Sequence, residues 1–466
     1  MRLETRPAPP RASSSISTSS KCDSPSSPVY TLTTCIAAPL PQWKTRLPYH
    51  LRTPYTFGSA RARSIDLPPD QSINLGKFQT AWCAHGFLRE LVLIYPVYAI
   101  MMGQNGVSPL DLSLLFAAWS SSVILLEVPS GALADIMSRK RLMIISCLVK
   151  GCCFLIWFFL PSFWGYFIGF LVWGFGSTLG SGTRESLVHD TLRDAGQQDK
   201  FIKIYGRGAA AQDLGVATAL AAGGLLAESG YGLSLWLSAI APWCASLVVL
   251  FAIAEPTRSG NLRSPREPSY LQTMRSGIRE VRGNRLLVMI IAMFSTIIVV
   301  YGVLDEFIGP YLFEKGTLSL TAIGLVAASL MIARMFGNAF AHRLPVRSLS
   351  GIALFLAAMS CFIFLSLPVA GFLTGLPLAA YFAGSAAAEM QLQTRLQQSI
   401  EGRSRATITS LASAGQETTG VFLYLAVGVS AEFMRWHGSL ALIGTLSVTL
   451  CLWFTWAARR LEKHDV

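Results

Sequence analysis

Charged residues are scarce in this sequence. Only 14% of its 466 residues are Asp, Glu, Lys or Arg, whereas soluble domains carry about 25%. The hydrophobic share is 52% and the mean hydropathy is +0.47. These values exclude an ordinary soluble domain and predict an all-α protein that crosses a lipid bilayer several times.

The short motifs of common enzymes are also missing. The sequence has no phosphate-binding G-x-x-x-x-G-K-S/T loop, no H-E-x-x-H zinc motif and no G-x-S-x-G nucleophile turn. Its nine cysteines include no C-x-x-C pair and no His/Cys cluster, so we expect neither a disulfide framework nor a metal site. We therefore predict that the protein is not an enzyme, has no cofactor and does not use ATP directly.

The net charge of +12 needs an explanation, because a basic balance also occurs in proteins that bind nucleic acid. Here the basic residues stand in short polar segments between long apolar runs. Such a distribution sets the orientation of membrane helices. We therefore expect no nucleic acid partner.

From Trp82 onward the chain alternates apolar runs with short polar segments. Each run is close to the length of about 20 residues that a helix needs to cross a bilayer. The pattern predicts twelve transmembrane helices, at about 80–102, 110–130, 142–160, 163–183, 207–227, 232–253, 286–309, 319–341, 348–367, 370–392, 406–430 and 436–458.

Residues 1–75 differ from the rest of the chain. Ser, Thr, Pro and Arg dominate, acids are few and no apolar run reaches spanning length, so we expect a disordered extension. Two alternatives remain open: an organelle transit peptide, or sequence that precedes the true start of the protein. The next methionine after Met1 is Met101, which already lies inside the first predicted helix.

The stretch Gly131–Arg141, GALADIMSRKR, forms a basic turn between the second and third runs. If this turn faces the cytoplasm, the inner loops and the C-terminal segment hold about 23 Lys and Arg residues. The outer loops then hold only Lys315 and Arg435. Basic residues stay on the cytoplasmic side, so we predict that both termini are cytoplasmic.

Five residues of this turn match a known transporter signature, G-x-x-x-D-x-x-G-R-K/R, except that a serine replaces the second glycine. They are Gly131, Asp135, Ser138, Arg139 and Lys140. With the twelve runs, this motif makes residues 80–458 similar to the major facilitator superfamily, and most similar to its bacterial-type twelve-helix drug-efflux members. The resemblance implies two six-helix bundles that expose a central site to each side in turn, in a monomer of the bacterial inner membrane.

The two halves of the chain also resemble each other. Gly131 precedes Gln212-Asp213 by 81 positions, and Gly337 precedes Gln416-Glu417 by 79 positions. Such internal symmetry is typical of transporters built from two repeats. We therefore expect an N-terminal bundle at 76–254, a cytoplasmic linker at 255–285, a C-terminal bundle at 286–458 and a cytoplasmic tail at 459–466.

The resemblance also implies that the basic turn is a gate. Asp135 and Arg139 would hold the bundles together on the inside while the cavity opens outward, with Glu185 as a possible partner of Arg139. Gly131 and Lys140 complete this gate motif. The alternative is a basic loop that only fixes orientation.

Several ionisable residues fall inside predicted spans, where their cost favours a role in a site or an ion pair. Arg89, Glu90 and Lys150 form either an internal salt bridge or a clamp for an anion or substrate, and His85 shares a helix face with Arg89. Arg334 and Glu389 are further candidates. Glu127 and Asp305-Glu306 lie near span ends, where they can reach an interface or pair there.

Asp213 and Glu417 occupy corresponding positions in the two halves, each next to a glutamine, Gln212 or Gln416. Both lie roughly 12 to 18 Å inside their predicted helices. We expect them to form a central protonatable pair. The alternative is that they only make hydrogen bonds between helices.

The sequence thus predicts a secondary active transporter that moves a small molecule by alternating access. Protons are the expected coupling ion, and efflux of amphipathic compounds ranks ahead of uptake by a symporter or facilitator. Antiport is left open, because the antiporter motif of the fifth span is met only at Gly215, Gly223 and Gly224. A membrane sensor or assembly protein without transport is the alternative from another class.

Overall fold

The computed structural model describes residues 74–255, 278–279, 281–344, 346, 348–400 and 405–464. Within these residues every regular element is a helix. The predicted extension 1–75 and most of the predicted linker 255–285 lie outside the described residues.

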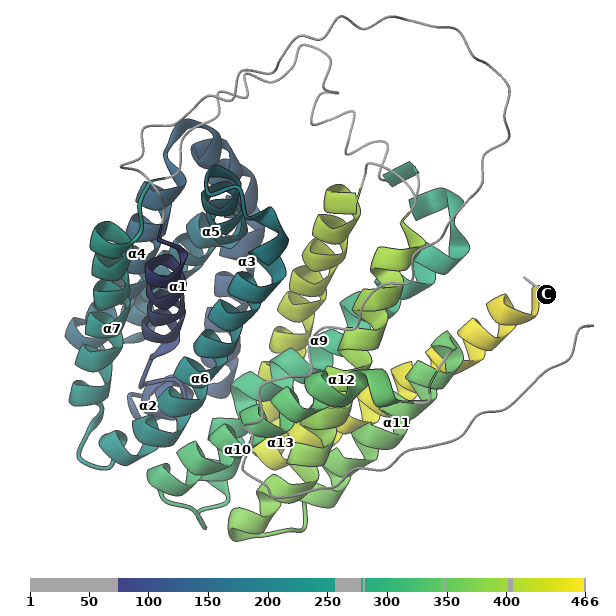
Figure 1. The fold of residues 1–466 in the computed structure, drawn as a ribbon. Helices are drawn as coiled ribbons and strands as arrows, with labels where there is room; N and C mark the ends of the chain where they lie inside the picture. Colours follow the sequence, from purple (N-terminus) through teal and green to yellow (C-terminus); the bar gives the residue numbers. More distant parts are fainter. Residues whose placement is uncertain are drawn as a thin grey trace, which may run out of the picture. The chain divides into compact units, whose positions relative to one another are not determined.

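A first group of helices packs together (Figure 1). Helix α1 contacts α6 and α7, α4 contacts α5 and α7, and α3 contacts α5. Ser108, Ser138 and Ser162 each accept a hydrogen bond from a backbone N–H of the following first turn, which explains why α3, α4 and α5 begin where they do. The group comprises α1 Leu75–Glu90, α2 Tyr98–Gln104, α3 Pro109–Ile136, α4 Arg139–Phe159, α5 Phe163–Asp194, the 3₁₀ turn Gln198–Lys200, α6 Phe201–Ala227 and α7 Tyr231–Ala252.

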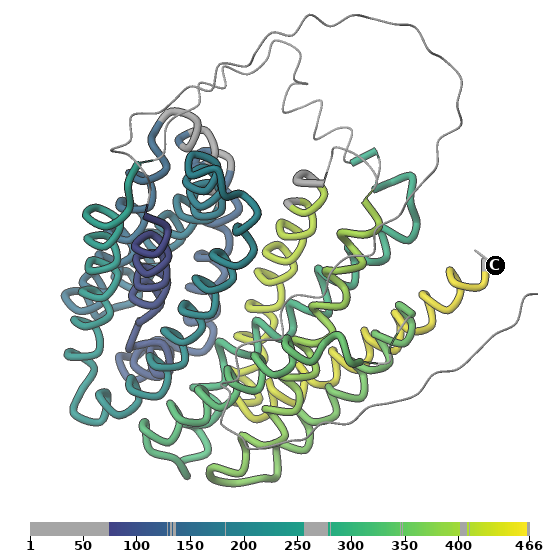
Figure 2. The backbone as a smooth tube through the Cα atoms, in the orientation of Figure 1, coloured from purple at the N-terminus to yellow at the C-terminus, as the bar shows by residue number. Residues whose placement is uncertain are grey.

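A second group follows in the chain (Figure 2). Its longest element breaks at Arg435, whose φ of 59° is left-handed, so it comprises two helices. Trp436 N starts the second of them and donates to Glu314 Oε2 at 2.9 Å. The group comprises α9 Arg285–Glu314, α10 Leu320–Phe340, α11 Leu349–Ser366, α12 Gly375–Ser399, α13 Arg405–His464 and the 3₁₀ turns Ala341–Arg343 and Gly371–Thr374.

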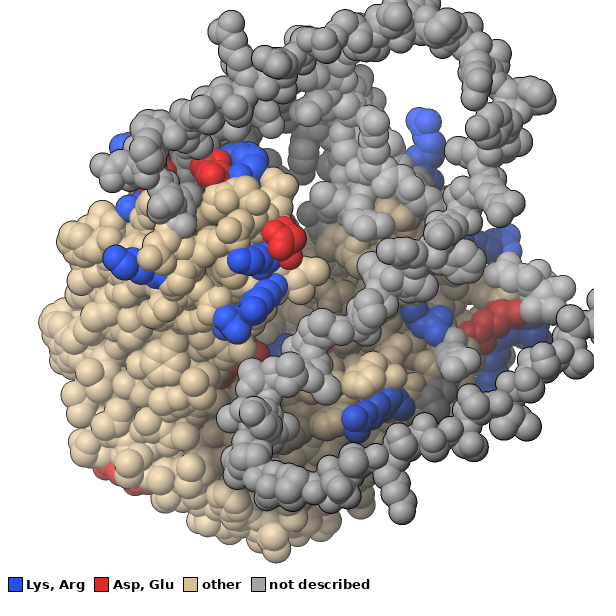
Figure 3. All heavy atoms as spheres, in the orientation of Figure 1, with Lys and Arg blue, Asp and Glu red and all other residues tan. Residues whose placement is uncertain are grey.

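Among the described residues, nine helices are long and apolar enough to cross a membrane. They cover ten of the twelve predicted spans, because α13 contains the runs at 406–430 and 436–458. The other two predicted spans lie on α1 with α2, and on α5. In Figure 3 the α1–α7 group shows a broad uncharged surface, with most of its charged side chains near one end. The membrane fold is confirmed, and the count of twelve stays a prediction.

The first predicted span, 80–102, is wrong as a single helix. Helix α1 ends at Glu90 and α2 starts at Tyr98. Pro96 lies in the break, and a proline lacks the N–H that a continuous helix needs. Ile94 N instead donates to Ser238 Oγ of α7 at 3.0 Å, so non-helical backbone at this depth is satisfied by another helix.

Helix α5 extends beyond the fourth predicted span, 163–183. Helix α5 runs on to Asp194, because its polar last third can stay helical without being apolar. Arg184, Glu185 and Asp190 therefore belong to a helix.

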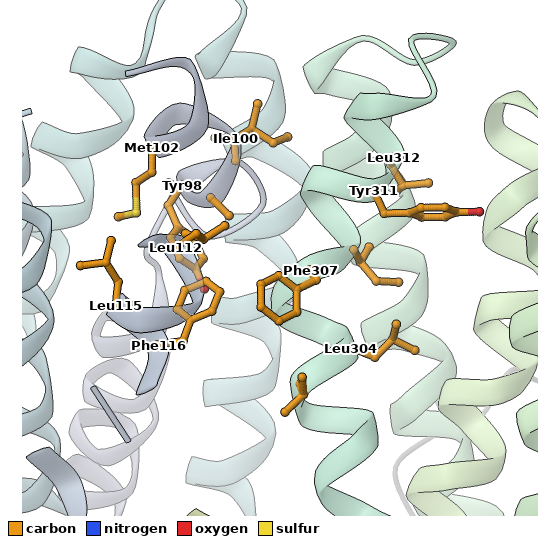
Figure 4. Close-up of a cluster of buried hydrophobic side chains, with 14 of the residues drawn as sticks. Tyr98, Ile100, Met102, Leu112, Leu115, Phe116, Leu304, Phe307, Tyr311 and Leu312 are labelled. Carbon is orange, nitrogen blue, oxygen red and sulfur yellow. The ribbon is translucent and has the colours of Figure 1, made fainter. Parts of the chain in front are cut away.

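The helices have a basic end and an opposite end. The basic end contains the join between α3 and α4 at Met137–Ser138, and the opposite end contains the join between α4 and α5 at Leu160–Ser162. A buried apolar cluster connects the two helical groups toward the opposite end (Figure 4). Phe116 of α3 and Phe307 of α9 face each other there, with ring centroids 5.4 Å apart.

Candidate functional site

The two helical groups touch along seams where glycine lets backbones approach. At the seam of α6 and α10, a Cβ on Gly224 would lie 2.3 Å from the carbonyl oxygen of Leu320. A Cβ on Gly324 would lie 2.6 Å from the carbonyl oxygen of Leu220. Small residues permit such close helix packing in membranes. This seam tolerates no larger side chain without moving one group.

A second seam joins α3 and α13, again close to the opposite end. A Cβ on Gly428 would lie 2.4 Å from the side chain of Ser113. At a third contact, a Cβ on Gly309 of α9 would lie 3.1 Å from the carbonyl oxygen of Pro96, in the break between α1 and α2. These contacts close the space between the groups at the opposite end.

Two glutamates cap helices of the other group. Glu228 follows α6, and its Oε1 accepts from Thr321 N at 2.9 Å and from Thr321 Oγ1 at 3.1 Å, in the first turn of α10. Glu432 of α13 accepts with Oε1 from Leu110 N at 3.1 Å, in the first turn of α3. A carboxylate is favourable there because the free N–H groups of a helix start are partly positive. We call these two contacts the glutamate latches.

The latches are related by the internal symmetry. Glu228 and Glu432 are 204 positions apart, as are Asp213 and Glu417. Each latch reaches the second residue after a serine N-cap, Ser108 or Ser319. The hydrogen bond from Thr321 N lowers the pKa of Glu228 most, and the hydrogen bond from the Thr321 hydroxyl lowers it further. Sequence reasoning missed both glutamates, although their equal spacing was a usable signal.

A cavity of about 360 Å³ lies between the groups, a size suited to a small molecule. Both groups contribute to its wall. The polar lining includes Gln212, Asp213, Asp305, Glu306 and Arg334, and the aromatic lining consists of Tyr95, Tyr98, Phe116, Trp119, Phe170, Trp173, Tyr301 and Phe382.

Arg334 of α10 is the central charge of this cavity. It interacts electrostatically with Asp213 of α6, Asp305 of α9 and Glu389 of α12. Its guanidinium lies over the ring of Tyr301, 5.1 Å from the centroid. One cation therefore lies within electrostatic reach of three carboxyl groups that belong to three other helices.

The acids of α9 belong to the cavity wall. Asp305 and Glu306 both line it, and Glu306 accepts a hydrogen bond from the hydroxyl of Tyr98 of the first group. From the sequence, these two acids were predicted to lie near the end of a span. Their position within the long apolar run of α9 was the signal for a site.

Five aromatic residues of the predicted spans divide into two sets. Trp119, Trp173 and Tyr301 line the cavity. Trp157 and Tyr381 are at most 1% exposed and pack inside their own helical groups.

Arg89, Glu90 and Lys150 form the internal salt bridge. Glu90 Oε1 lies 2.9 Å from Arg89 Nη1, and Glu90 Oε2 lies 2.8 Å from Lys150 Nζ. Lys150 also donates to the carbonyl oxygen of Arg89 at 3.0 Å. The hydroxyl of Tyr95 donates to Glu90 Oε2 at 3.0 Å, so the cluster extends to the wall of the central cavity.

A smaller cavity of about 40 Å³ lies inside the first helical group. It is lined by Trp82, His85 and Arg89 of α1, Arg184 of α5, and Gln212 of α6, among others. Gln212 also lines the central cavity, so this residue borders both spaces.

The basic turn is held within the first group. Arg139, the first residue of α4, pairs with Asp190 of α5 and donates to the carbonyl oxygen of Ser186 at 2.9 Å. Lys140 Nζ donates to the carbonyl oxygen of Leu250 at 2.8 Å. Asp190, which was not among the predicted residues, lies farther along the same helix than the possible partner Glu185.

Asp135 and Arg139 are not neighbours on one helix. Helix α3 ends at Ile136 and α4 begins at Arg139, with Ser138 as its N-cap. The side chains of Gly131–Ala132 and Ala134–Ile136 lie outside the described residues. The gate role of the turn therefore stays a prediction.

Asp213 and Glu417 belong to different seams. Asp213 interacts electrostatically with Arg334 of α10. Glu417 accepts a hydrogen bond from the hydroxyl of Ser120 of α3. Each acid thus faces the opposite group, and the described interactions place them at separate contacts instead of against each other.

Comparison with known proteins agrees with this architecture. The family profile described as Major Facilitator Superfamily matches residues 86–422. Among curated protein sequences, none is significantly similar to this chain.

Solved structures show the same fold at low sequence identity. A mutant of the nucleoside transporter NupG superposes with a TM-score of 0.68 at 13% identity, covering 81% of this chain and 98% of that one. A bacterial homologue of the human lysosomal transporter Spinster, inward-facing and unoccupied, gives 0.64 at 15% identity over 83% and 96%. A D-xylose–proton symporter gives 0.63 at 13% identity over 82% and 98%. Because the family profile matches more than half of the sequence, this chain belongs to the major facilitator superfamily of membrane transporters.

Proposed function

We propose that the protein is a secondary active transporter that moves a small molecule through the central cavity by alternating access. The observation that carries this proposal is the cavity of about 360 Å³, whose wall is shared by both helical groups. A site at such an interface changes its exposure when one group rocks against the other. The glycine seams and the latches supply the contacts that such a motion has to break.

The described contacts between the groups cluster at the opposite end, which supports a conformation that is closed there. With the basic end in the cytoplasm, this is an inward-facing conformation. Both termini are then cytoplasmic, and the protein is a monomer of the bacterial inner membrane. The bundles span 76–254 and 286–458, joined by a linker at 255–285 and followed by a tail at 459–466.

In the other conformation the basic turn acts as the inner gate. Arg139 is held beside Asp190 and Lys140 beside the end of α7, so the turn moves with the first group as one body. Gly131 and Asp135 then lie where the second group closes on the cytoplasmic side. Glu185 is exposed near this surface and is available to the gate.

Protons are the proposed coupling ion. Asp213 and Glu417 each face the other group, so the closing and opening of the seams changes the surroundings of both carboxyl groups. A carboxyl group that meets different neighbours in two states can bind a proton in one and release it in the other. Gln212 and Gln416, their neighbours in sequence, are the accompanying hydrogen-bonding groups.

The aromatic wall favours flat or amphipathic compounds, and efflux is the first choice of direction. Uptake by a symporter or facilitator is the second candidate, because the solved structures with this fold include a D-xylose–proton symporter and a nucleoside transporter. A sensor or assembly protein is the candidate without transport.

Flux measurements in proteoliposomes test the proposal. Purified protein is reconstituted, and the uptake of a panel of labelled compounds is followed with and without a pH gradient. We expect gradient-dependent accumulation of at least one compound. The variant Asp213→Asn with Glu417→Gln should lose this accumulation and keep exchange, while the exposed control Glu255→Gln should retain both. The absence of any protein-dependent flux across the panel would support the sensor or assembly protein.

A further inference from the structure

The small cavity beside α1 contains buried polar atoms that the protein does not satisfy. His85 is 2% exposed, and its Nε2 has no hydrogen-bond partner among the described residues. Trp82, almost one turn earlier, is 5% exposed, and its Nε1 also has none there. Both side chains line the cavity. Buried polar atoms are normally hydrogen-bonded, so two such atoms on one wall indicate a polar ligand.

The charges around this cavity do not balance. Arg89 and Arg184 line it, and Lys150 lies directly behind Arg89, so that together they contribute three positive charges. In the part of the chain that the structure describes, Glu90 is the only carboxylate within 4.0 Å of any of them, and it is shared by Arg89 and Lys150. A buried charge normally has a counter-charge, because its transfer from water is costly. The excess of positive charge therefore favours a negatively charged ligand.

Arg184 is the cation that is best placed to bind it. Its Nε donates to the carbonyl oxygen of Gly180 at 3.3 Å, and its Nη1 donates to Gln212 Oε1 at 3.1 Å. Both partners are neutral oxygen atoms, and no carboxylate of the described ranges lies within 4.0 Å of this guanidinium. A guanidinium has a planar fork of donors that matches a carboxylate.

The volume of the cavity limits the ligand to a small group. A single water molecule needs roughly 10 to 15 Å³ of cavity volume. A cavity of about 40 Å³ therefore holds about three non-hydrogen atoms. A carboxyl group has three such atoms, whereas a phosphate has five, so the size favours the carboxyl group.

The imidazole of His85 defines where a proton can bind. Its Nδ1 lies 3.4 Å from the carbonyl oxygen of Ala245, which can only accept, so Nδ1 carries hydrogen. The other nitrogen, Nε2, is then an acceptor unless it binds a proton. Around the ring, α1 contributes Arg89 and Glu90 and α5 contributes Arg184, while α6 adds the hydroxyl of Tyr205 and α7 adds no charged side chain.

We propose that this cavity binds the carboxylate group of a small organic acid, whose negative charge allows His85 Nε2 to take up one proton. Arg184, Arg89 and the indole N–H of Trp82 supply the donors for the carboxylate oxygens. Gln212 borders both spaces, so the apolar part of the acid occupies the aromatic central cavity. The proposal rests on the transport function in this one respect, since it makes an organic acid a transported substrate.

Binding of benzoate to the purified protein in detergent tests the site without any transport. Titration calorimetry at pH 7.5, in two buffers of different ionisation enthalpy, gives the affinity and the number of protons taken up. Benzamide is the matched neutral probe. We expect benzoate to bind at least tenfold more tightly than benzamide and to take up about one proton per molecule, because the imidazole is neutral beforehand.

Variants assign the roles of the two residues. Arg184→Gln should weaken benzoate binding at least tenfold. His85→Gln should keep measurable binding but abolish the proton uptake. If His85 had only a structural role, this replacement would leave the proton uptake unchanged. Arg459→Gln and His437→Gln, both exposed and outside the cavity, are the matched controls and should bind as the wild type does. Size-exclusion profiles verify that each variant is folded.

Equal affinity for benzoate and benzamide in the wild type would overturn the proposal without reference to any variant. Benzoate binding without proton uptake would overturn the assignment of His85. If benzoate binds as expected but no compound is transported, the proposed function fails and the site stands. If flux of other compounds is found without benzoate binding, the site fails and the transport function stands.

Discussion

Replacement of Glu228 and Glu432 by alanine should release the opposite end of the protein. Each glutamate caps a helix of the other group, so its hydrogen bonds exist only while that end is closed. A helix cap of this kind contributes about 0.5 to 1 kcal/mol for an exposed carboxylate. One variant should therefore shift the ratio of closed to open molecules by a factor of about 2 to 5.

The two latches lie at different seams, α6 with α10 and α3 with α13, so their effects should add. The double variant should then lose about 1 to 2 kcal/mol of closure, which is a factor of about 5 to 30 in the population ratio. Glu462→Ala is the matched control. Glu462 also caps a helix start, accepting from Leu349 N at 2.9 Å, but both partners belong to the second group.

Distances between spin labels measure the shift. Cysteines at Leu160 and Phe372, both more than half exposed at the opposite end, report the separation of the two groups in a background without native cysteines. We expect the long-distance fraction to rise in each single variant and most in the double variant. Glu462→Ala should lower the thermal stability without changing this fraction. An unchanged distance distribution in the double variant would refute the reasoning.

Three further predictions follow from described contacts or from the sequence motif. Asp135→Asn should reduce transport in proteoliposomes while membrane insertion stays normal; full activity in this variant would remove the gate role of the turn. Glu90→Gln should lower the free energy of unfolding by about 3 to 5 kcal/mol, because it leaves two buried cations without their shared partner, and adding Lys150→Met should restore part of that loss in thermal unfolding. The pKa of Glu228 is lowered in the closed state, so its latch should be complete at neutral pH and weaken only as the pH falls through that lowered value. In the variant Glu228→Gln, the opening of the opposite end should not change with pH in this range. If the wild type already opens at a pH well above the lowered pKa of Glu228, this assignment is contradicted.

The sequence predicted the membrane class and most helices, because a bilayer requires long apolar runs that are visible in one dimension. It failed at 91–97, where the apolar run continues but Pro96 cannot take part in a helix. The signal was present in the proline, and the hydropathy of its neighbours masked it.

Residues that act between distant helices were harder to predict. Arg334 was visible as an intramembrane cation, but nothing local shows that it interacts electrostatically with Asp213, Asp305 and Glu389. The same holds for Asp190 beside Arg139, because the register between α4 and α5 is set by packing. For Arg89, Glu90 and Lys150 the sequence left a salt bridge and a ligand clamp open, and the structure shows the salt bridge, since few partners exist for a charge at that depth.

The polar character of α1 has a consequence for how the protein is made. This helix has 16 residues, includes Arg89 and Glu90, and is not among the helices that are apolar enough to cross a membrane alone. Lys150, which pairs with Glu90 of α1, lies on α4 and is synthesised later. We therefore expect α1 to leave the ribosome before its electrostatic partner exists, so that its stable integration waits for α4.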